Sequence, residues 1–347
     1  MPFGSILLAI VGVAVLMVVH ESGHYFAARY FGMKVTTYSI GFGPTLWSHK
    51  PEGSPTTYQI GVIPFLAYVR IEGLNPFEET DPNDKGNYQN ASLWARIVTI
   101  TAGSAANYLF AFVLVFLGLI IGGKREYDDV SMRVQVEPNS PAAAAGMQSG
   151  DRILSVAGVA VHDWKELPAQ IGKHPGEPTD IEIERNGTVM HLTATPGSEG
   201  ERAGKIQIRP VSTVVRVPIG EAVVTSLKAP PKVVYALFSG IGQLIAKRQA
   251  PGVSGPVNIV KDVSLAVEMG FSDAFRMLGN LSAYLGVFNL MPFPALDGGR
   301  LLFLLYEAIA RRKVNEKAEA MVHAAGMLMF LALMVVVTVK EILPSGH

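Results

Sequence analysis

No cysteine occurs among the 347 residues of the chain. Disulfide bonds and cysteine-ligated metal centres are therefore excluded, and any zinc site must use histidine and carboxylate ligands. Charged residues are also scarce: they make up 17% of the chain, against roughly 25% in soluble domains. Basic and acidic residues number 29 each, so the net charge is zero and the composition does not favour a nucleic-acid partner.

Apolar residues, in contrast, make up 49% of the chain, and the mean hydropathy is +0.29. Four long apolar runs cover about residues 4–31, 94–122, 273–290 and 321–339. A helix of about 20 such residues crosses the hydrocarbon core of a bilayer, so each run is a predicted transmembrane helix. The first run has no basic segment before it and no small-residue cleavage site after it, which favours a retained helix over a signal peptide. The sequence therefore predicts a polytopic α-helical membrane protein.

Two segments between these runs have the character of strands. Residues 36–71 are rich in β-branched and aromatic residues punctuated by glycine and proline, and they predict a sheet or a hairpin. Residues 130–197 alternate apolar and polar side chains around Arg185-Asn-Gly187, which is a strong hairpin signal. We expect this second segment to form a small β-rich domain. An amphipathic stretch over 220–248 is expected to lie along the membrane surface.

The predicted organisation has four parts. Residues 1–125 form an N-terminal membrane half, 126–200 the β-rich domain, 201–256 a linker strand with the amphipathic stretch, and 257–347 a C-terminal membrane half. Basic residues gather in the short segment 300–320, which is therefore expected on the cytoplasmic side. With four spans, both chain ends and the β-rich domain are then expected on the outer side.

The pentapeptide His20-Glu21-Ser22-Gly23-His24 closes the first apolar run. Residues four apart lie on one face of a helix, so His20 and His24 are placed to share one Zn²⁺, with Glu21 beside the metal as a general base. Three ionisable groups inside a membrane helix are unfavourable unless they have a function and a partner. The alternative is a polar helix end at the lipid interface, and the pentapeptide alone leaves it open.

A zinc protease needs a third protein ligand and one position left open for water. Asp297 is the best candidate, because it follows a proline-broken segment at membrane depth and precedes a pair of glycines. An equally good interpretation is that Asp297 caps a helix beginning near Arg300. Asn107 is a polar residue within the second predicted span, where either a helix-to-helix hydrogen bond or a substrate contact would satisfy it.

With these residues in order, the sequence resembles the site-2 protease family of intramembrane zinc metalloproteases, and more closely its bacterial branch that cleaves anti-sigma factors. The resemblance covers nearly the whole chain. It rests on the histidine pentapeptide, one PDZ-like insert and three further motifs: Gly41-Phe-Gly-Pro44, Gly103-Ser-Ala-Ala-Asn107 and Asn289-Leu-Met-Pro-Phe-Pro-Ala-Leu-Asp-Gly-Gly299.

The resemblance implies a Zn²⁺ cofactor and a role for six residues. These are the zinc ligands His20, His24 and Asp297, the water-activating Glu21, and the substrate-holding Asn107 and Asn289. It also implies that 36–71 is a membrane-associated sheet beside the site. The implied substrates are single-span membrane proteins, such as an anti-sigma factor or signal-peptide remnants, cut in regulated intramembrane proteolysis. The implied location is the bacterial inner membrane, with the PDZ-like domain on the periplasmic side.

The chain departs from the family in two places. Ser104 stands where the family often has proline, and Leu66-Ala67 stands where it often has two glycines. Both differences concern substrate gating and leave the chemistry intact. Two other functions would also place polar residues in a membrane protein of this kind. A non-catalytic membrane scaffold presenting a PDZ-like module would lack zinc, and a metal transporter would normally carry polar residues along several helices.

Overall fold

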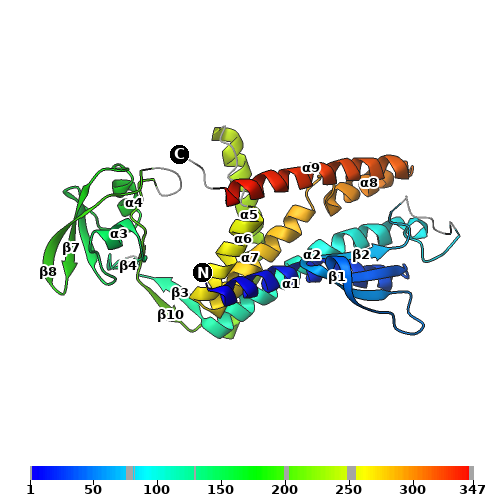
Figure 1. Cartoon of the computed structure of the whole chain (residues 1–347), viewed down its shortest axis with the longest axis horizontal. Helices are drawn as coiled ribbons and strands as arrows, with labels where there is room; N and C mark the ends of the chain where they lie inside the picture. Colours follow the sequence, from blue (N-terminus) through cyan, green and yellow to red (C-terminus); the bar gives the residue numbers. More distant parts are fainter. Residues whose placement is uncertain are drawn as a thin grey trace. The chain divides into compact units, whose positions relative to one another are not determined.

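The computed structural model describes residues 2–75, 81, 83–128, 130–198, 203–247 and 255–343 (Figure 1). The chain forms two compact units. One consists of Met1–Gly122 together with Val217–His347, and the other is Gly123–Arg216. We call the first the membrane unit and the second the insert. Residues 201–202 and 248–254 of the predicted linker lie outside the described residues.

Helices dominate the membrane unit. They are α1 (Phe3–Tyr30), α2 (Leu93–Gly122), α5 (Ile219–Lys247), α6 (Pro256–Met269), α7 (Phe271–Asn289), α8 (Asp297–Ala310) and α9 (Glu316–Ile342), with a 3₁₀ turn at Tyr88–Asn90. Within the described part of the chain, three helical stretches are long and apolar enough to cross a membrane: α1, α2 and Lys317–Ile342 of α9. The third predicted run, 273–290, forms α7, which is 19 residues long but is not among these three stretches.

Two helical features were not predicted. No helix was expected over 257–272, where most of α6 lies. The amphipathic stretch forms α5, which continues as one helix through Pro230 and Pro231. Proline normally interrupts a helix because it lacks an N–H and crowds the preceding turn, so the local sequence gave no signal for a continuous helix of this length.

The segment 36–71 forms β1 (Val35–His49) and β2 (Thr57–Ile71), which pair antiparallel. Tyr38 of β1 has two partners in β2, namely Val69 and Tyr58. Different stretches of β2 therefore flank β1 on its two sides. It follows that residues 67–71 form one edge of this sheet among the described residues.

The helices of the membrane unit pack closely through small residues. α2 lies beside both α1 and α7 (Figure 1). A Cβ atom added to Gly286 of α7 would lie 2.9 Å from the backbone oxygen of Ser104 in α2. Ser282 of α7 donates a hydrogen bond of 2.8 Å to the backbone oxygen of Asn107. Small residues and side-chain hydrogen bonds are the usual means of helix association in a membrane, because lipid removes the hydrophobic driving force.

An ion pair fixes α8 against α2. The Arg96 guanidinium of α2 donates two hydrogen bonds, of 3.0 and 2.6 Å, to the Glu307 carboxylate of α8. Arg96 is buried, and paired, bidentate geometry is what makes a buried charge tolerable. A cluster of buried apolar side chains, including Ala28 of α1, Ile71 of β2 and Leu304 of α8, packs around the same junction. The end of α1, the sheet edge and α8 are thereby held together.

The insert is a β-rich unit with its own apolar core. Its main sheet is antiparallel in the order β6-β5-β7-β8, from Val159–Ala160, Arg152–Val156, Thr179–Arg185 and Thr188–Ala194. The smaller elements are β3 (Lys124–Tyr127) paired with β10 (Ser212–Val215), β4 (Val134–Val136) paired with β9 (Ile208–Pro210), α3 (Pro141–Ala144) and α4 (Glu166–Ile171). The predicted hairpin is confirmed: Asn186 and Gly187 join β7 to β8 with φ of 51° and 80°.

Candidate metal centre

The two histidines of the pentapeptide face the same point. His20 and His24 lie on one side of α1, and both are buried. Their rings meet edge to face, with centroids 4.8 Å apart, and their Nε2 atoms are 3.2 Å apart. The spacing of four residues produces this arrangement, because the helix brings the second ring back beneath the first.

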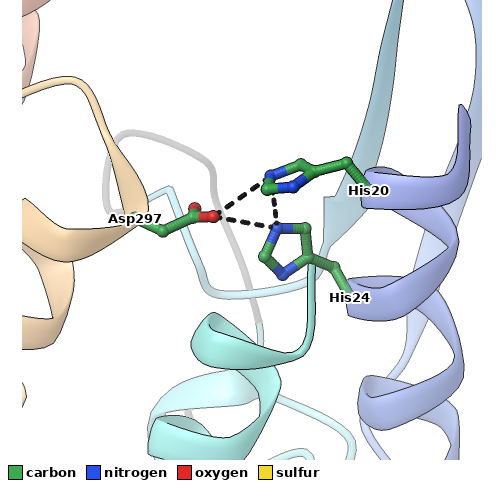
Figure 2. Close-up of side chains that lie close together, drawn as sticks. All are labelled: His20, His24 and Asp297. Carbon is green, nitrogen blue, oxygen red and sulfur yellow. Dashed lines mark hydrogen bonds and ion pairs between the residues drawn. The ribbon is translucent and has the colours of Figure 1, made fainter. Parts of the chain in front are cut away.

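Asp297 completes a triangle with these rings. Its Oδ2 atom lies 3.2 Å from Nε2 of His20 and 3.2 Å from Nε2 of His24 (Figure 2). Asp297 is the first residue of α8, and the N-cap position belongs to Leu296. Its side chain therefore turns toward the histidines, whereas the alternative interpretation had it capping the helix.

The dimensions of this triangle suit zinc. A tetrahedral zinc ion with bonds of about 2.0–2.1 Å to nitrogen and oxygen holds its ligand atoms roughly 3.3–3.4 Å apart. The three atoms here are 3.2 Å apart. Oδ2 of Asp297 is buried and has no hydrogen-bond donor among the described residues. Three lone pairs directed at one point repel one another unless a proton or a cation lies between them, so the group fits a cation.

Contacts behind the histidines determine which ring nitrogen faces the triangle. Nδ1 of His24 lies 2.8 Å from the backbone oxygen of Thr99 in α2. A carbonyl oxygen only accepts, so Nδ1 carries the proton and Nε2 keeps its lone pair. Such an outer hydrogen bond is the usual way in which a protein orients a metal-binding histidine.

Asn107 contacts the other histidine. Its fully buried amide nitrogen lies 3.4 Å from Nδ1 of His20, while its oxygen has no partner among the described residues. The oxygen and nitrogen of an amide are assigned from their surroundings. If the amide is turned over, its oxygen accepts a hydrogen bond from Nδ1–H of His20. Nε2 of His20 then carries no proton and faces the triangle with its lone pair, as Nε2 of His24 does.

Glycines let α1 and α2 approach each other closely at the site. A Cβ atom added to Gly103 of α2 would lie 2.7 Å from Cε1 of His24, and one added to Gly23 of α1 would lie 2.7 Å from the backbone carbonyl carbon of Ala102. Real Cβ atoms do not approach so closely. The two glycines therefore allow α2 to approach α1, and Gly103 leaves the space that the His24 ring occupies.

Glu21 and Asn289 occupy different surroundings. Glu21 is half-buried next to His20, and the backbone N–H of Val69 at the edge of β2 lies near its carboxylate. Asn289 is the last residue of α7 and is half-buried. Contacts join four of the six predicted residues, namely His20, His24, Asp297 and Asn107, and Glu21 is adjacent to His20 in sequence. Among the described residues Asn289 makes no hydrogen bond with this group.

The comparisons with known proteins decide the family. The sequence profile of peptidase family M50 matches residues 8–333. This chain belongs to peptidase family M50. It is 29% identical over 422 residues to zinc metalloprotease RasP of Geobacillus kaustophilus, covering 97% of each chain. It is 30% identical over 344 residues to a Clostridium acetobutylicum protein named "Putative zinc metalloprotease", covering 99% of this chain and 98% of the relative.

Membership of M50, the site-2 protease family, confirms the predicted resemblance. The chain is a metalloprotease of a zinc-dependent peptidase family. Its three span-capable helices agree with a membrane protease. A Synechocystis relative bearing the same name as the clostridial protein is 33% identical over 347 residues, covering 97% of this chain and 94% of the relative.

Thr99 of the centre was missed by sequence reasoning. It acts through its main-chain carbonyl oxygen. Every residue carries this group, so no side-chain pattern marks it. Gly103 was part of a quoted motif without an assigned role, and its role as the space beside His24 depends on the packing of two distant helices.

Gly103→Ala is expected to weaken zinc binding at least tenfold, since a methyl group would displace the His24 ring and shifts of ligand orientation commonly cost about 10–100-fold in metal affinity. The measurement is zinc retained by the purified protein during titration with a chelator. Gly4→Ala is the matched control, because a Cβ atom there meets open space. Wild-type affinity in Gly103→Ala would contradict the inferred close contact.

Proposed function

We propose that this chain is an intramembrane zinc endopeptidase that cleaves transmembrane segments of single-span membrane proteins. The observation that carries the proposal is the triangle of buried acceptor atoms from His20 and His24 of the span-capable α1 and from Asp297 of α8. His20 is 17 residues beyond the start of α1, or about 26 Å along the helix axis, which is within a hydrocarbon core of about 30 Å.

His20, His24 and Asp297 are the proposed zinc ligands. When bound, zinc supplies Lewis-acid chemistry, polarising a peptide carbonyl and making a water molecule more acidic. Glu21 is the proposed general base: its carboxylate takes a proton from the attacking water and later gives it to the leaving amine. The position of Glu21 supports this role, because it is adjacent in sequence to a proposed zinc ligand and its carboxylate lies near the Val69 N–H of the sheet edge.

The two asparagines are proposed to position groups at the site. The contact of Asn107 with His20 supports a role through the ligand, and its complete burial means that direct contact with substrate would need the amide to become accessible. Asn289 retains the proposed substrate role, since its half-buried position at the end of α7 leaves the amide without a hydrogen bond among the described residues.

The edge of β2 is proposed to hold the unwound substrate. Alternate residues of a strand direct their N–H groups to opposite edges. The N–H of Glu72 donates to the backbone oxygen of Lys34 next to β1, whereas that of Val69 lies near Glu21. The N–H of Ala67 therefore shares the direction of that of Val69, toward the site. A helical substrate must open to expose a carbonyl, and strand addition would satisfy its backbone.

Substrate identity and topology extend this proposal. The substrates are anti-sigma factors or signal-peptide remnants already shortened by another protease, and the insert is a PDZ-like module that screens them. α7 is the proposed fourth span: its 19 residues measure about 29 Å, and it packs on α2 through small residues. Basic Arg312 and its neighbours then lie in the cytoplasm of a bacterial inner membrane, with the insert and both chain ends in the periplasm.

The non-catalytic scaffold is the less favoured alternative. A scaffold has no need of three acceptor atoms held 3.2 Å apart in an apolar interior, where unpaired polar groups are unfavourable. The same observation speaks against a transporter, since the polar groups are collected at one level of the helices.

Glu21→Gln is expected to keep about one zinc per chain and to lower cleavage at least a hundredfold, because general-base catalysis contributes about 10²–10⁴. Asp297→Ala is expected to lose the zinc. Elemental analysis of the purified variants and cleavage of co-expressed, tagged single-span proteins give the two readouts, with the exposed Glu52→Gln as control. Cleavage by Glu21→Gln near the wild-type rate would remove Glu21 from the chemistry.

Ala67→Pro is expected to reduce cleavage roughly five- to tenfold while zinc is retained, because it removes one hydrogen-bond donor worth about 1 kcal/mol from the edge of β2. Ala67→Val keeps the N–H and is expected to remain within about threefold of wild type by the same argument. Steady-state cleavage of a purified substrate in detergent distinguishes them. If the zinc-loaded proline variant cuts as fast as Ala67→Val, the substrate is not held by this edge.

The absence of native cysteine allows a direct test of orientation. Thr188→Cys on β8 is expected to react with a membrane-impermeant maleimide in intact cells, since Thr188 is exposed in the insert. Arg312→Cys, also exposed, is expected to react only after the inner membrane is opened. The reverse labelling pattern would invert the proposed topology.

A further inference from the structure

α9 carries one histidine within its span-capable stretch, at position 323. The His323 side chain is buried, with 8% of its surface exposed. A polar ring in such a helix is unfavourable unless it has a partner and a use. The family motifs discussed above include no residue of α9, so this histidine is not explained by them.

The partner of His323 is the backbone of the segment that leads into α8. The N–H of Ala295 donates a hydrogen bond of 3.2 Å to Nδ1 of His323. Nδ1 accepts only when it carries no proton, so the ring is held in one tautomer. Ala295 is two residues before Asp297, and His323 therefore acts on the chain immediately before the third proposed zinc ligand.

Ala295 has an unfavourable backbone conformation. Its φ is +83°, in a region that residues other than glycine rarely adopt. Such a conformation persists only where surrounding contacts maintain it. The backbone of Leu296 bonds to Phe293, and that of Gly299 bonds to Leu296, so the turn passes directly into the first turn of α8. If Ala295 relaxed to a negative φ, the direction of the chain at Asp297 would change.

Packing of α9 against this turn gives an independent observation. Gly326 lies three residues after His323 and so on the same face of α9. A Cβ atom added to Gly326 would lie 2.7 Å from the backbone carbonyl carbon of Pro294. A Cβ atom added to Gly299 of α8 would lie 3.1 Å from Cε1 of His323. α9 therefore rests directly on the turn, with no space between.

We propose that His323 is a positioning residue for the zinc site: by accepting the Ala295 N–H, it holds the turn that directs the Asp297 carboxylate toward His20 and His24. This inference rests on the proposed role of Asp297 as a zinc ligand. The competing explanation is packing alone, since the ring also lies 5.8 Å from that of Phe303. If His323 served packing alone, an apolar side chain of similar size would replace it equally well. Substitutions that keep the size but remove the hydrogen-bond acceptor therefore distinguish packing from positioning.

The test measures zinc affinity in the full-length protein in detergent by chelator competition, together with the visible spectrum of the Co²⁺-substituted protein. His323→Leu removes the acceptor and is expected to lower zinc affinity about 10–100-fold and to change the Co²⁺ spectrum. His323→Asn places a carbonyl oxygen at about the position of Nδ1 and is expected to restore affinity to within about threefold. Wild-type affinity and spectrum in His323→Leu would overturn the proposal, as would equal losses in both variants.

A second variant covers the case in which His323→Leu does not fold. Gly326→Ala displaces the same turn from α9 and is expected to weaken zinc binding, whereas Gly240→Ala in α5 meets open space and is the control. Unchanged affinity in Gly326→Ala would then overturn the proposal. Full zinc binding by Asp297→Ala would instead refute the proposed ligand set. Loss of zinc in Asp297→Ala with none in His323→Leu would refute this inference alone.

Discussion

The arrangement of the membrane unit depends on three acceptor atoms that face one another at 3.2 Å in an apolar interior. Nε2 of His20, Nε2 of His24 and Oδ2 of Asp297 can stay so close only with a positive charge between them. The surrounding structure maintains this geometry from several directions. Glycines let α2 approach α1, the backbone oxygen of Thr99 orients His24, and the Arg96–Glu307 ion pair fixes α8 against α2.

A second constraint concerns the irregular backbone beside the triangle. Its N–H and C=O groups need hydrogen-bond partners within the protein, because lipid offers none. The chain between α7 and α8 meets it with short-range hydrogen bonds, from Met291 to Phe288, from Phe293 to Met291 and from Leu296 to Phe293. Ala295 is the exception, since its N–H bonds to His323 of α9. α9 therefore helps to fix the turn that immediately precedes Asp297, although His323 lies 28 residues from Ala295 in sequence.

Features that follow from the local spacing and type of residues could be predicted from the sequence. The four-residue spacing of His20 and His24, the apolar runs of α1, α2 and α9, and the Asn186-Gly187 hairpin each follow from local rules and agree with the structure. The pairing of Asp297 with the histidines depended on a resemblance, because helix capping was an equally good local use. The main-chain contact from Thr99 and the space beside Gly103 could not be predicted, since they arise from tertiary packing.

Zinc K-edge X-ray absorption of the purified protein tests this ligand set directly. The expected spectrum is that of a four-coordinate ion with nitrogen and oxygen neighbours at about 2.0–2.1 Å, and with outer-shell scattering from two imidazole rings. One carboxylate and one exchangeable water would complete the first shell. A first shell with no imidazole scattering, or with three or more imidazole rings, would contradict the assignment of His20, His24 and Asp297 as the zinc site.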